Sequence, residues 1–156
     1  MKVILPGSYD PVTLGHLEII KRAASTYDEV YAVAFVNPEK EYLFSPEEKV
    51  EMLALATAGL PNVKVGYSSG YVVDYMRDGG IEKIIKGYRN DADLEYEKIQ
   101  SDYNLKTGGY QTELWLAEGK YKNISSTEAR RLILSGGDLS ELLPDSVIEY
   151  VKRRKR

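Results

Sequence analysis

His16, the only histidine of this 156-residue chain, ends the run Pro6–His16 (PGSYDPVTLGH), which follows the apolar stretch Val3–Leu5. This order predicts a short buried strand, a tight turn and an amphipathic helix. Thr13 is the expected N-cap, which puts His16 in the first turn. Unpaired backbone N–H groups and the positive end of the helix dipole face the same point there. We therefore expect an anion site, where Gly15 lets a phosphate approach closely and His16 offers an imidazole N–H.

Basic side chains follow two other predicted strands. Lys40 belongs to the segment Asn37–Glu41, and Lys86 and Arg89 bound the segment Lys86–Arg89. Each of them alone is typical of a charged surface. Because the carboxyl ends of parallel strands meet at one edge of a sheet, we expect all three cations to lie together there. Such a group suits a polyphosphate, to which arginine can donate two parallel hydrogen bonds.

The loop Tyr121–Glu128 predicts a second helix N-terminus. Ser125 and Glu128 have the spacing of a capping box, which by itself indicates only where a helix begins. Ser126 and Thr127 then fall in the first helical turn. Two hydroxyls beside free N–H groups form a second candidate cradle for phosphate.

The elements that would position these residues alternate between strand and helix. Strands are expected at Lys2–Leu5, Glu29–Val36, Val63–Tyr67, Lys83–Lys86 and Glu113–Leu116. Helices are expected at Leu14–Thr26, Pro46–Ala58, Val72–Asp78, Asp91–Lys106 and from Ser126 through Leu132. Helices between short apolar strands indicate right-handed βαβ units and a parallel sheet. We predict one α/β domain over residues 1–156: a Rossmann-like, doubly wound, five-stranded sheet with helices on both faces.

Composition excludes several classes of site. The chain has no cysteine and one histidine, which excludes disulfides, thiolate nucleophiles and a His-rich zinc site. Residues 1–151 hold 16 basic and 24 acidic residues, which argues against a broad nucleic-acid surface. The basic tail 152–156 is interpreted as a solvated helix end. No apolar run is long enough to span a membrane, and no signal-peptide pattern opens the chain, so we expect a cytoplasmic protein.

The run Pro6–His16 resembles the signature of the T/HxGH nucleotidylyltransferase superfamily. Thr13, where many relatives have a first histidine, is typical of its phosphopantetheine adenylyltransferase branch. Further segments resemble that branch or the superfamily in the same order: Lys86–Arg89 with Asp93–Glu97, Ile124–Thr127, and Gly136–Ser140 with Leu143–Pro144. The resemblance covers nearly the whole chain.

The resemblance implies adenylyl transfer from MgATP to the 4′-phosphate of phosphopantetheine, which yields dephospho-coenzyme A and pyrophosphate. The attacking phosphate is already an anion and needs no general base, so catalysis consists of positioning and charge stabilisation. His16 would stabilise the transition state as a catalytic residue together with Lys40. Ser8 and Lys40 would contact the incoming phosphate. Lys86 would complete the phosphopantetheine site, with Val72 near the pantetheine arm.

The resemblance also implies the ATP site, the metal and the assembly. The ATP-binding residues would be Ser8, Tyr9, His16, Gly87, Tyr88, Arg89, Glu97, Tyr121, Lys122, Asn123, Ile124, Ser125, Ser126 and Thr127. Mg²⁺ would be bound mainly through the ATP phosphates, with no metal-ligating residues of the protein. The chain would work in coenzyme A biosynthesis as a homo-oligomer, a hexamer by resemblance.

Three departures from the branch leave the acceptor open. Lys86 stands where the family usually has arginine, and Asn123 replaces an aromatic or apolar residue. Thr127 with Arg130 resembles the form found in nicotinate-mononucleotide adenylyltransferases. One alternative is thus a related adenylyl- or cytidylyltransferase that acts on nicotinate mononucleotide or a sugar phosphate. Thr13 argues against nicotinate mononucleotide, because that branch typically has histidine at this position. The other is a non-catalytic nucleotide-binding paralogue, against which the intact motif residues argue.

Overall fold

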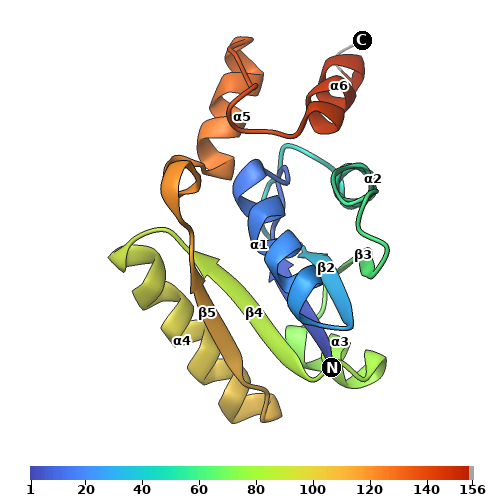
Figure 1. Cartoon of the computed structure of the whole chain (residues 1–156), viewed down its shortest axis with the longest axis vertical. Coiled ribbons are helices and arrows are strands. Elements are labelled where there is room, and N and C mark those ends of the chain that lie inside the picture. Colours follow the sequence, from blue (N-terminus) through green and yellow to red (C-terminus); the bar gives the residue numbers. More distant parts are fainter. Residues whose placement is uncertain (155–156) are drawn as a thin grey trace.

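Residues 1–154, which the computed structural model describes, form alternating strands and helices (Figure 1). The strands are β1 (Lys2–Gly7), β2 (Glu29–Phe35), β3 (Val63–Ser68), β4 (Lys83–Tyr88) and β5 (Thr112–Leu116). The helices are α1 (Leu14–Thr26), α2 (Pro46–Ala56), α3 (Val72–Gly79), α4 (Asp91–Gly108), α5 (Ser126–Ser135) and α6 (Asp145–Arg154), with a 3₁₀ helix η1 (Gly119–Asn123) before α5. The last two residues of the predicted basic tail, Lys155 and Arg156, lie outside the described residues.

The five strands are parallel and lie in the order β3-β2-β1-β4-β5. The chain moves outward from β1 to β3 on one side, then returns to place β4 on the other side of β1. This reversal creates a switch point between the carboxyl ends of β1 and β4, where doubly wound sheets bind ligands. The predicted Rossmann-like sheet is confirmed.

Alternation along the strands divides the core between the two faces of the sheet. In β1, Val3 and Leu5 belong to the larger apolar cluster, with Ile20 of α1 and Leu53 of α2, while Ile4 faces the opposite side. The smaller cluster on that side joins Ile4 to residues of β2, α3 and β4, namely Val33, Met76, Ile81 and Ile84. Both faces are covered, as a parallel sheet requires (Figure 1).

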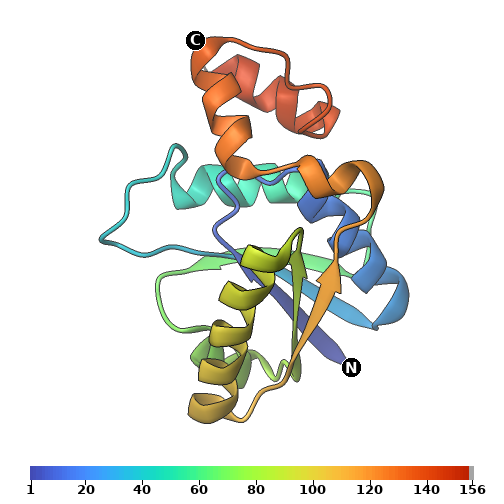
Figure 2. The ribbon, with the colours of Figure 1, turned by 90° about the vertical axis from the view of Figure 1, so that its left-hand side faces the viewer.

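The last two helices close the carboxyl end of the sheet (Figure 2). Their connection is fixed to the start of α1, because the backbone N–H of Leu14 donates to the Leu142 carbonyl at 2.8 Å. In α6, Arg154 pairs with the Glu48 carboxylate and donates to the Leu43 carbonyl at 2.9 Å. Arg154 is exposed, as expected for a solvated helix end, but Glu48 of α2 and the Leu43 carbonyl before α2 supply partners for its guanidinium.

Helix starts follow the capping signals. The Ser45 hydroxyl accepts from the Glu48 N–H at 3.1 Å, and the Glu48 carboxylate accepts from the Ser45 N–H at 2.8 Å, which confirms the predicted capping box of α2. The helix ends two residues earlier than expected, at Ala56, where the Thr57 hydroxyl donates to the Leu53 carbonyl. None of the helices in residues 1–154 combines the length and hydropathy that crossing a bilayer requires.

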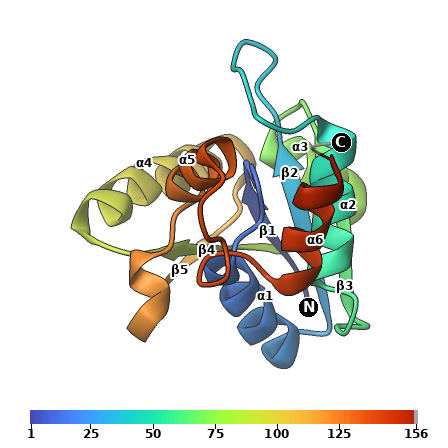
Figure 3. The same cartoon turned by 90° about the horizontal axis from the view of Figure 1, so that it is seen from above.

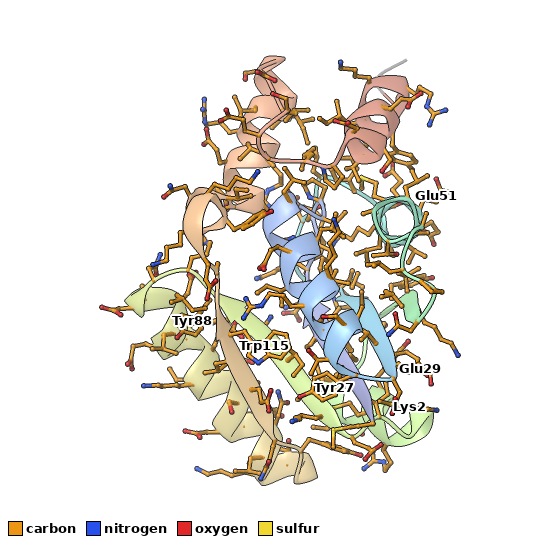
Figure 4. The ribbon with its side chains drawn as sticks, viewed as in Figure 1. Lys2, Tyr27, Glu29, Glu51, Tyr88 and Trp115 are labelled. Carbon is orange, nitrogen blue, oxygen red and sulfur yellow. The ribbon has the colours of Figure 1, made fainter. Side chains whose placement is uncertain are left out.

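A polar cluster fixes the edge strand β5 to the rest of the sheet. The Glu113 carboxylate accepts from Lys83 at 2.7 Å, from the Tyr27 hydroxyl at 3.2 Å and from the Trp115 indole N–H at 3.1 Å. The Lys83 hydrogen bond is the main reason that the pKa of Glu113 is lowered. Arg22 lies 5.1 Å from the Trp115 ring centre, and Figure 4 shows Tyr27 and Trp115 beside α1. The cluster thereby holds the strand that leads to η1 and α5.

We expect Gly108, at the end of α4, to be intolerant of any side chain. A Cβ built there would lie 2.7 Å from Cγ1 and 2.8 Å from Cβ of Val73 on α3. Gly108→Ala should lower the free energy of unfolding by about 1–3 kcal/mol, because α3 and α4 would have to separate. Urea denaturation measures the change. The matched control is Gly59→Ala, which meets nothing within 4 Å and should leave stability unchanged or slightly higher. Equal effects at the two positions would contradict the close approach of α3 and α4.

Candidate active site

A cavity of about 540 Å³ opens at the switch point between β1 and β4. Its walls come from the segment after β1, the end of β4, one face of α4 and the start of α5. Figure 3 looks down on this end of the sheet, with α5 lying above the strands. The volume lies within the range of sites for small molecules and cofactors.

The segment after β1 turns sharply at Tyr9. Its φ of 48° lies in the left-handed region, which is uncommon for a residue with a side chain. The buried phenol compensates by donating to the Leu5 carbonyl at 2.8 Å, and its ring packs against the His16 imidazole with centres 4.8 Å apart. Tyr9 therefore packs against the His16 ring and also lines the cavity.

Asp10, the next residue, holds three parts of the chain together. Its buried carboxylate accepts from the Leu43 N–H at 2.9 Å and from the Phe44 N–H at 3.0 Å. Arg130 of α5 donates to the Asp10 carbonyl at 3.0 Å, and its guanidinium lies 3.9 Å from the carboxylate. Asp10 thus fixes the segment before α1 to the connection between β2 and α2 and to α5.

His16 completes a capping box at the start of α1. The Thr13 hydroxyl accepts from the His16 N–H at 3.3 Å, and the Thr13 N–H donates to His16 Nδ1 at 3.0 Å. The predicted N-cap is confirmed. Because Nδ1 accepts a backbone proton, the neutral ring must carry its own proton on Nε2. His16 therefore presents one N–H donor from a fixed ring.

The surroundings keep this imidazole neutral. Burial, helped by the positive charges of Lys86 and Arg89, lowers the pKa of His16 to about 4. The ring is therefore uncharged near neutral pH, so that its N–H can stabilise developing negative charge as a dipole. The positive charge of the site comes from lysine and arginine.

Lys86, on β4, reaches across to the end of β1. Its ammonium donates to the Pro6 carbonyl at 2.9 Å and lies 3.6 Å from the Glu97 carboxylate of α4. Burial raises the pKa of Glu97 although Lys86 acts in the opposite direction. The hydrogen bond to Pro6 joins the two strands that flank the switch point, and the pair with Glu97 joins β4 to α4.

Arg89 follows β4 and is fixed by the first turn of α4. Both its backbone N–H and its Nε lie 3.1 Å from one oxygen of the Asp93 carboxylate. The Asn90 side chain caps α4 by accepting from the Asp93 N–H at 2.9 Å. Next to them, Gly87 packs closely against α1, since a Cβ there would lie 3.1 Å from Cγ1 of Ile19, closer than an ordinary contact.

The start of α5 forms the opposite wall. The Ser125 hydroxyl accepts from the Glu128 N–H at 3.1 Å, as the predicted cap requires, whereas the Glu128 carboxylate pairs with Arg131. The expected capping box is thus formed only in its first half. Ser126 donates to the Pro11 carbonyl at 2.9 Å, which joins this N-terminus directly to the segment before α1. Two helix N-termini consequently face one cavity.

The structure gathers most of the predicted site residues. The cavity is lined by Ser8, Tyr9, His16, Val72, Lys86, Gly87, Tyr88, Arg89, Glu97, Tyr121, Ile124, Ser125, Ser126 and Thr127. Lys40, Lys122 and Asn123 are exposed and do not line it. Lys40 lies on the connection between β2 and α2, which extends away from the sheet in Figure 3. Lys122 and Asn123 fall in η1, where Tyr121 and the following Ile124 line the cavity and these two residues do not.

Sequence reasoning missed two groups of lining residues. One is a face of α4 that includes Gln100, Ser101 and Asn104, which follow Glu97 at helical spacing. That spacing from a predicted site residue was a usable signal. The other is Arg130, one turn beyond Thr127 on α5. Within residues 1–154, no three side chains of the His, Cys, Asp or Glu type are grouped as a metal site.

Comparison with known proteins agrees with this geometry. The cytidylyltransferase-like family model matches residues 4–132. A phosphopantetheine adenylyltransferase from Corynebacterium efficiens is 41% identical over 155 residues, which is 99% of this chain and 98% of that protein. The chain belongs to the phosphopantetheine adenylyltransferase family. As a member it is a nucleotidyltransferase, and the cavity at the switch point is the candidate site of transfer.

A solved structure from Vibrio parahaemolyticus shares the fold of this phosphopantetheine adenylyltransferase family member. It is described as a candidate nicotinate-nucleotide adenylyltransferase and superposes with a TM-score of 0.71, covering 97% of this chain and 91% of its own. The two chains are 15% identical, so the likeness concerns the arrangement of strands and helices alone.

The single histidine makes the state of His16 directly measurable. In the free protein, its imidazole should titrate near pH 4 and carry its proton on Nε2 between pH 6 and 8. Histidine ¹⁵N chemical shifts followed by NMR from pH 8 to pH 3.5 report both properties without interference from a second histidine. A midpoint near 6.5, or a proton on Nδ1, would contradict the capping geometry.

Proposed function

We propose that this chain transfers the adenylyl group of ATP to the 4′-phosphate of phosphopantetheine, releasing pyrophosphate and forming dephospho-coenzyme A. The observation that carries the proposal is the fixed, neutral His16 between two helix N-termini, with Lys86 and Arg89 beside it. Full-length identity to an adenylyltransferase of that name supports the acceptor. We assign the reaction to the cytoplasm, where ATP is consumed in coenzyme A synthesis.

The chemistry proposed for these residues is positioning and charge stabilisation. The acceptor phosphate attacks the α-phosphorus of ATP, the bond to the β-phosphate breaks, and pyrophosphate leaves. The Nε2–H of His16 donates to the α-phosphoryl oxygens as their charge increases, and Arg89 with the start of α5 holds the leaving phosphates. Ser8 and Lys86 contact the acceptor phosphate. Because the pKa of His16 lies near 4, the ring stays neutral around pH 7, and the rate there should be independent of its titration.

Two further residues and a metal complete the proposal. Lys40 would reach the phosphates from its exposed loop, and Val72 lies at the wall expected for the pantetheine arm. We assign Mg²⁺ to the ATP phosphates, where it would neutralise part of their charge. The oxygen-rich triphosphate suits this hard cation, and residues 1–154 offer it no cluster of three acidic or histidine ligands.

The experiment that tests the function is pyrophosphate release from MgATP with 4′-phosphopantetheine, run beside nicotinate mononucleotide and glycerol 3-phosphate. We expect release with phosphopantetheine alone. His16→Ala should lower kcat by about 10²–10³-fold with nearly unchanged ATP affinity, because one donor to the transition state is lost.

The matched control separates the cap from the catalytic donor. In His16→Glu, a side-chain carboxylate oxygen can still accept from the Thr13 N–H, as glutamate does in capping boxes, but the side chain has no N–H to donate in place of Nε2. This variant should melt near the wild-type temperature and still lose turnover. Release with another acceptor only would overturn the substrate. Full turnover in His16→Glu would make His16 a purely structural residue.

We propose in addition that the chain self-associates through α4, with six copies expected from the resemblance. This 18-residue helix buries only Glu97, whereas Ile99 and Tyr103 are 66% and 50% exposed and lie one turn apart. Ile99→Asp should therefore reduce the molar mass measured by light scattering. Leu134→Asp on α5, where Leu134 is 74% exposed, is the control and should leave the mass unchanged. A monomeric wild type would overturn the assembly.

A further inference from the structure

Lys49, near the start of α2, is a completely buried lysine. Its ammonium makes no hydrogen bond to any of residues 1–154, and it lies 3.5 Å from the centre of the Tyr42 ring. Burial lowers the pKa of Lys49, although the Asp10 carboxylate acts in the opposite direction. Burying an ammonium without a hydrogen bond is unfavourable, and the aromatic face of Tyr42 compensates for it at close range, besides the charge of Asp10. The contact with Tyr42 is therefore the feature to explain.

Tyr42 is in turn attached to the loop that carries Lys40. Its hydroxyl accepts from the Asn37 N–H at 3.0 Å, so the residue after the loop is bonded to the first residue of the loop. Within the loop, the Asn37 carbonyl accepts from the Lys40 N–H at 2.9 Å, and its side chain accepts from the Glu39 N–H at 3.0 Å. The turn that presents Lys40 is consequently organised around Asn37 and closed by Tyr42.

The other side of Tyr42 is fixed to the candidate active site. Leu43 and Phe44 both donate their backbone N–H groups to the Asp10 carboxylate. Tyr42 therefore lies between a rigid support, at Asp10, and an exposed turn, at Asn37. Its ring rests on Lys49, which projects from α2 and cannot follow the turn.

We propose that Lys49 is a positioning residue: by holding the Tyr42 ring it fixes the base of the loop 37–41, so that Lys40 can reach the phosphates in the cavity. The inference rests on the proposed adenylyl transfer. The proposal accounts for the burial of Lys49. It also accounts for how Lys40, although exposed on an extended loop, can act at a defined point of the cavity.

A double-mutant cycle tests whether Lys49 acts through Lys40. Lys49→Met, which keeps the length of the side chain but removes its charge, should lower kcat about 5–20-fold and leave ATP affinity within about twofold. Lys49→Arg retains a cation over the ring and should recover most of this loss. In a Lys40→Ala background, Lys49→Met should change kcat by less than about twofold. Equal losses in both backgrounds would overturn the proposal, since a general structural defect is independent of Lys40.

A second measurement does not depend on activity. Hydrogen exchange of the Asn37 and Lys40 amides should accelerate at least about tenfold in Lys49→Met, while amides of α1 stay unchanged. Tyr42→Phe, which keeps the ring but loses the hydroxyl, should accelerate the same two amides and tests the bond from Tyr42 to Asn37. Lys49→Gln, which also removes the charge over the ring, replaces Lys49→Met if that variant does not fold. Unchanged exchange at both amides would overturn the tether. If the wild type released no pyrophosphate, the function would fail while the exchange result still decided the role of Lys49.

Discussion

The buried carboxylate of Asp10 is the constraint on which the site depends. Unpaired, it would be unfavourable at this depth, so the chain must bring donors to it. Those donors come from the connection after β2, through Leu43 and Phe44, with the cation of Arg130 nearby. Satisfying one group thus fixes the segment before α1, the base of the Lys40 loop and the start of α5 relative to one another. The two helix N-termini face one cavity because Asp10 and its neighbour Pro11, which accepts from Ser126, hold them there.

His16 shows how one side chain can serve folding and chemistry together. Its Nδ1 satisfies a backbone N–H that the start of α1 would otherwise leave open, and this use leaves Nε2 as the donor. Packing against Tyr9 fixes the plane of the ring, so the donor is oriented before a ligand arrives. Because the helix cap and the proposed catalytic donor belong to one ring, displacing the ring would remove both the hydrogen bond to Thr13 and the Nε2–H donor.

Local sequence signals were sufficient to predict most of the fold and part of the candidate site. Capping residues such as Thr13 and Ser45 locate helix starts because the bonds involved span three residues, and the apolar strands follow from their periodicity. The pairing of Lys86 with Glu97 was not predictable, since it depends on how α4 lies against β4. The chain has 13 tyrosines and two phenylalanines, and the structure gives several of the phenols a hydrogen-bond partner. Tyr27 bonds Glu113, which is distant in the sequence, while Tyr9 and Tyr42 bond Leu5 and Asn37 across turns, and Tyr31 bonds Glu29 within β2.

The charges of the cavity explain how an acidic chain can receive a polyphosphate. Each cation at its walls has a carboxylate partner: Lys86 has Glu97, Arg89 has Asp93 and Arg130 has Asp10. These pairs hold the cations in place without a ligand, so that little side-chain freedom is lost on binding. Phosphate oxygens must then compete with carboxylates, and at Lys86 the competitor is Glu97, whose pKa is raised by burial. Lys86 also donates to the Pro6 carbonyl at 2.9 Å, so in the proposed reaction an acceptor phosphate would have to replace part of a pairing that the folded chain already provides.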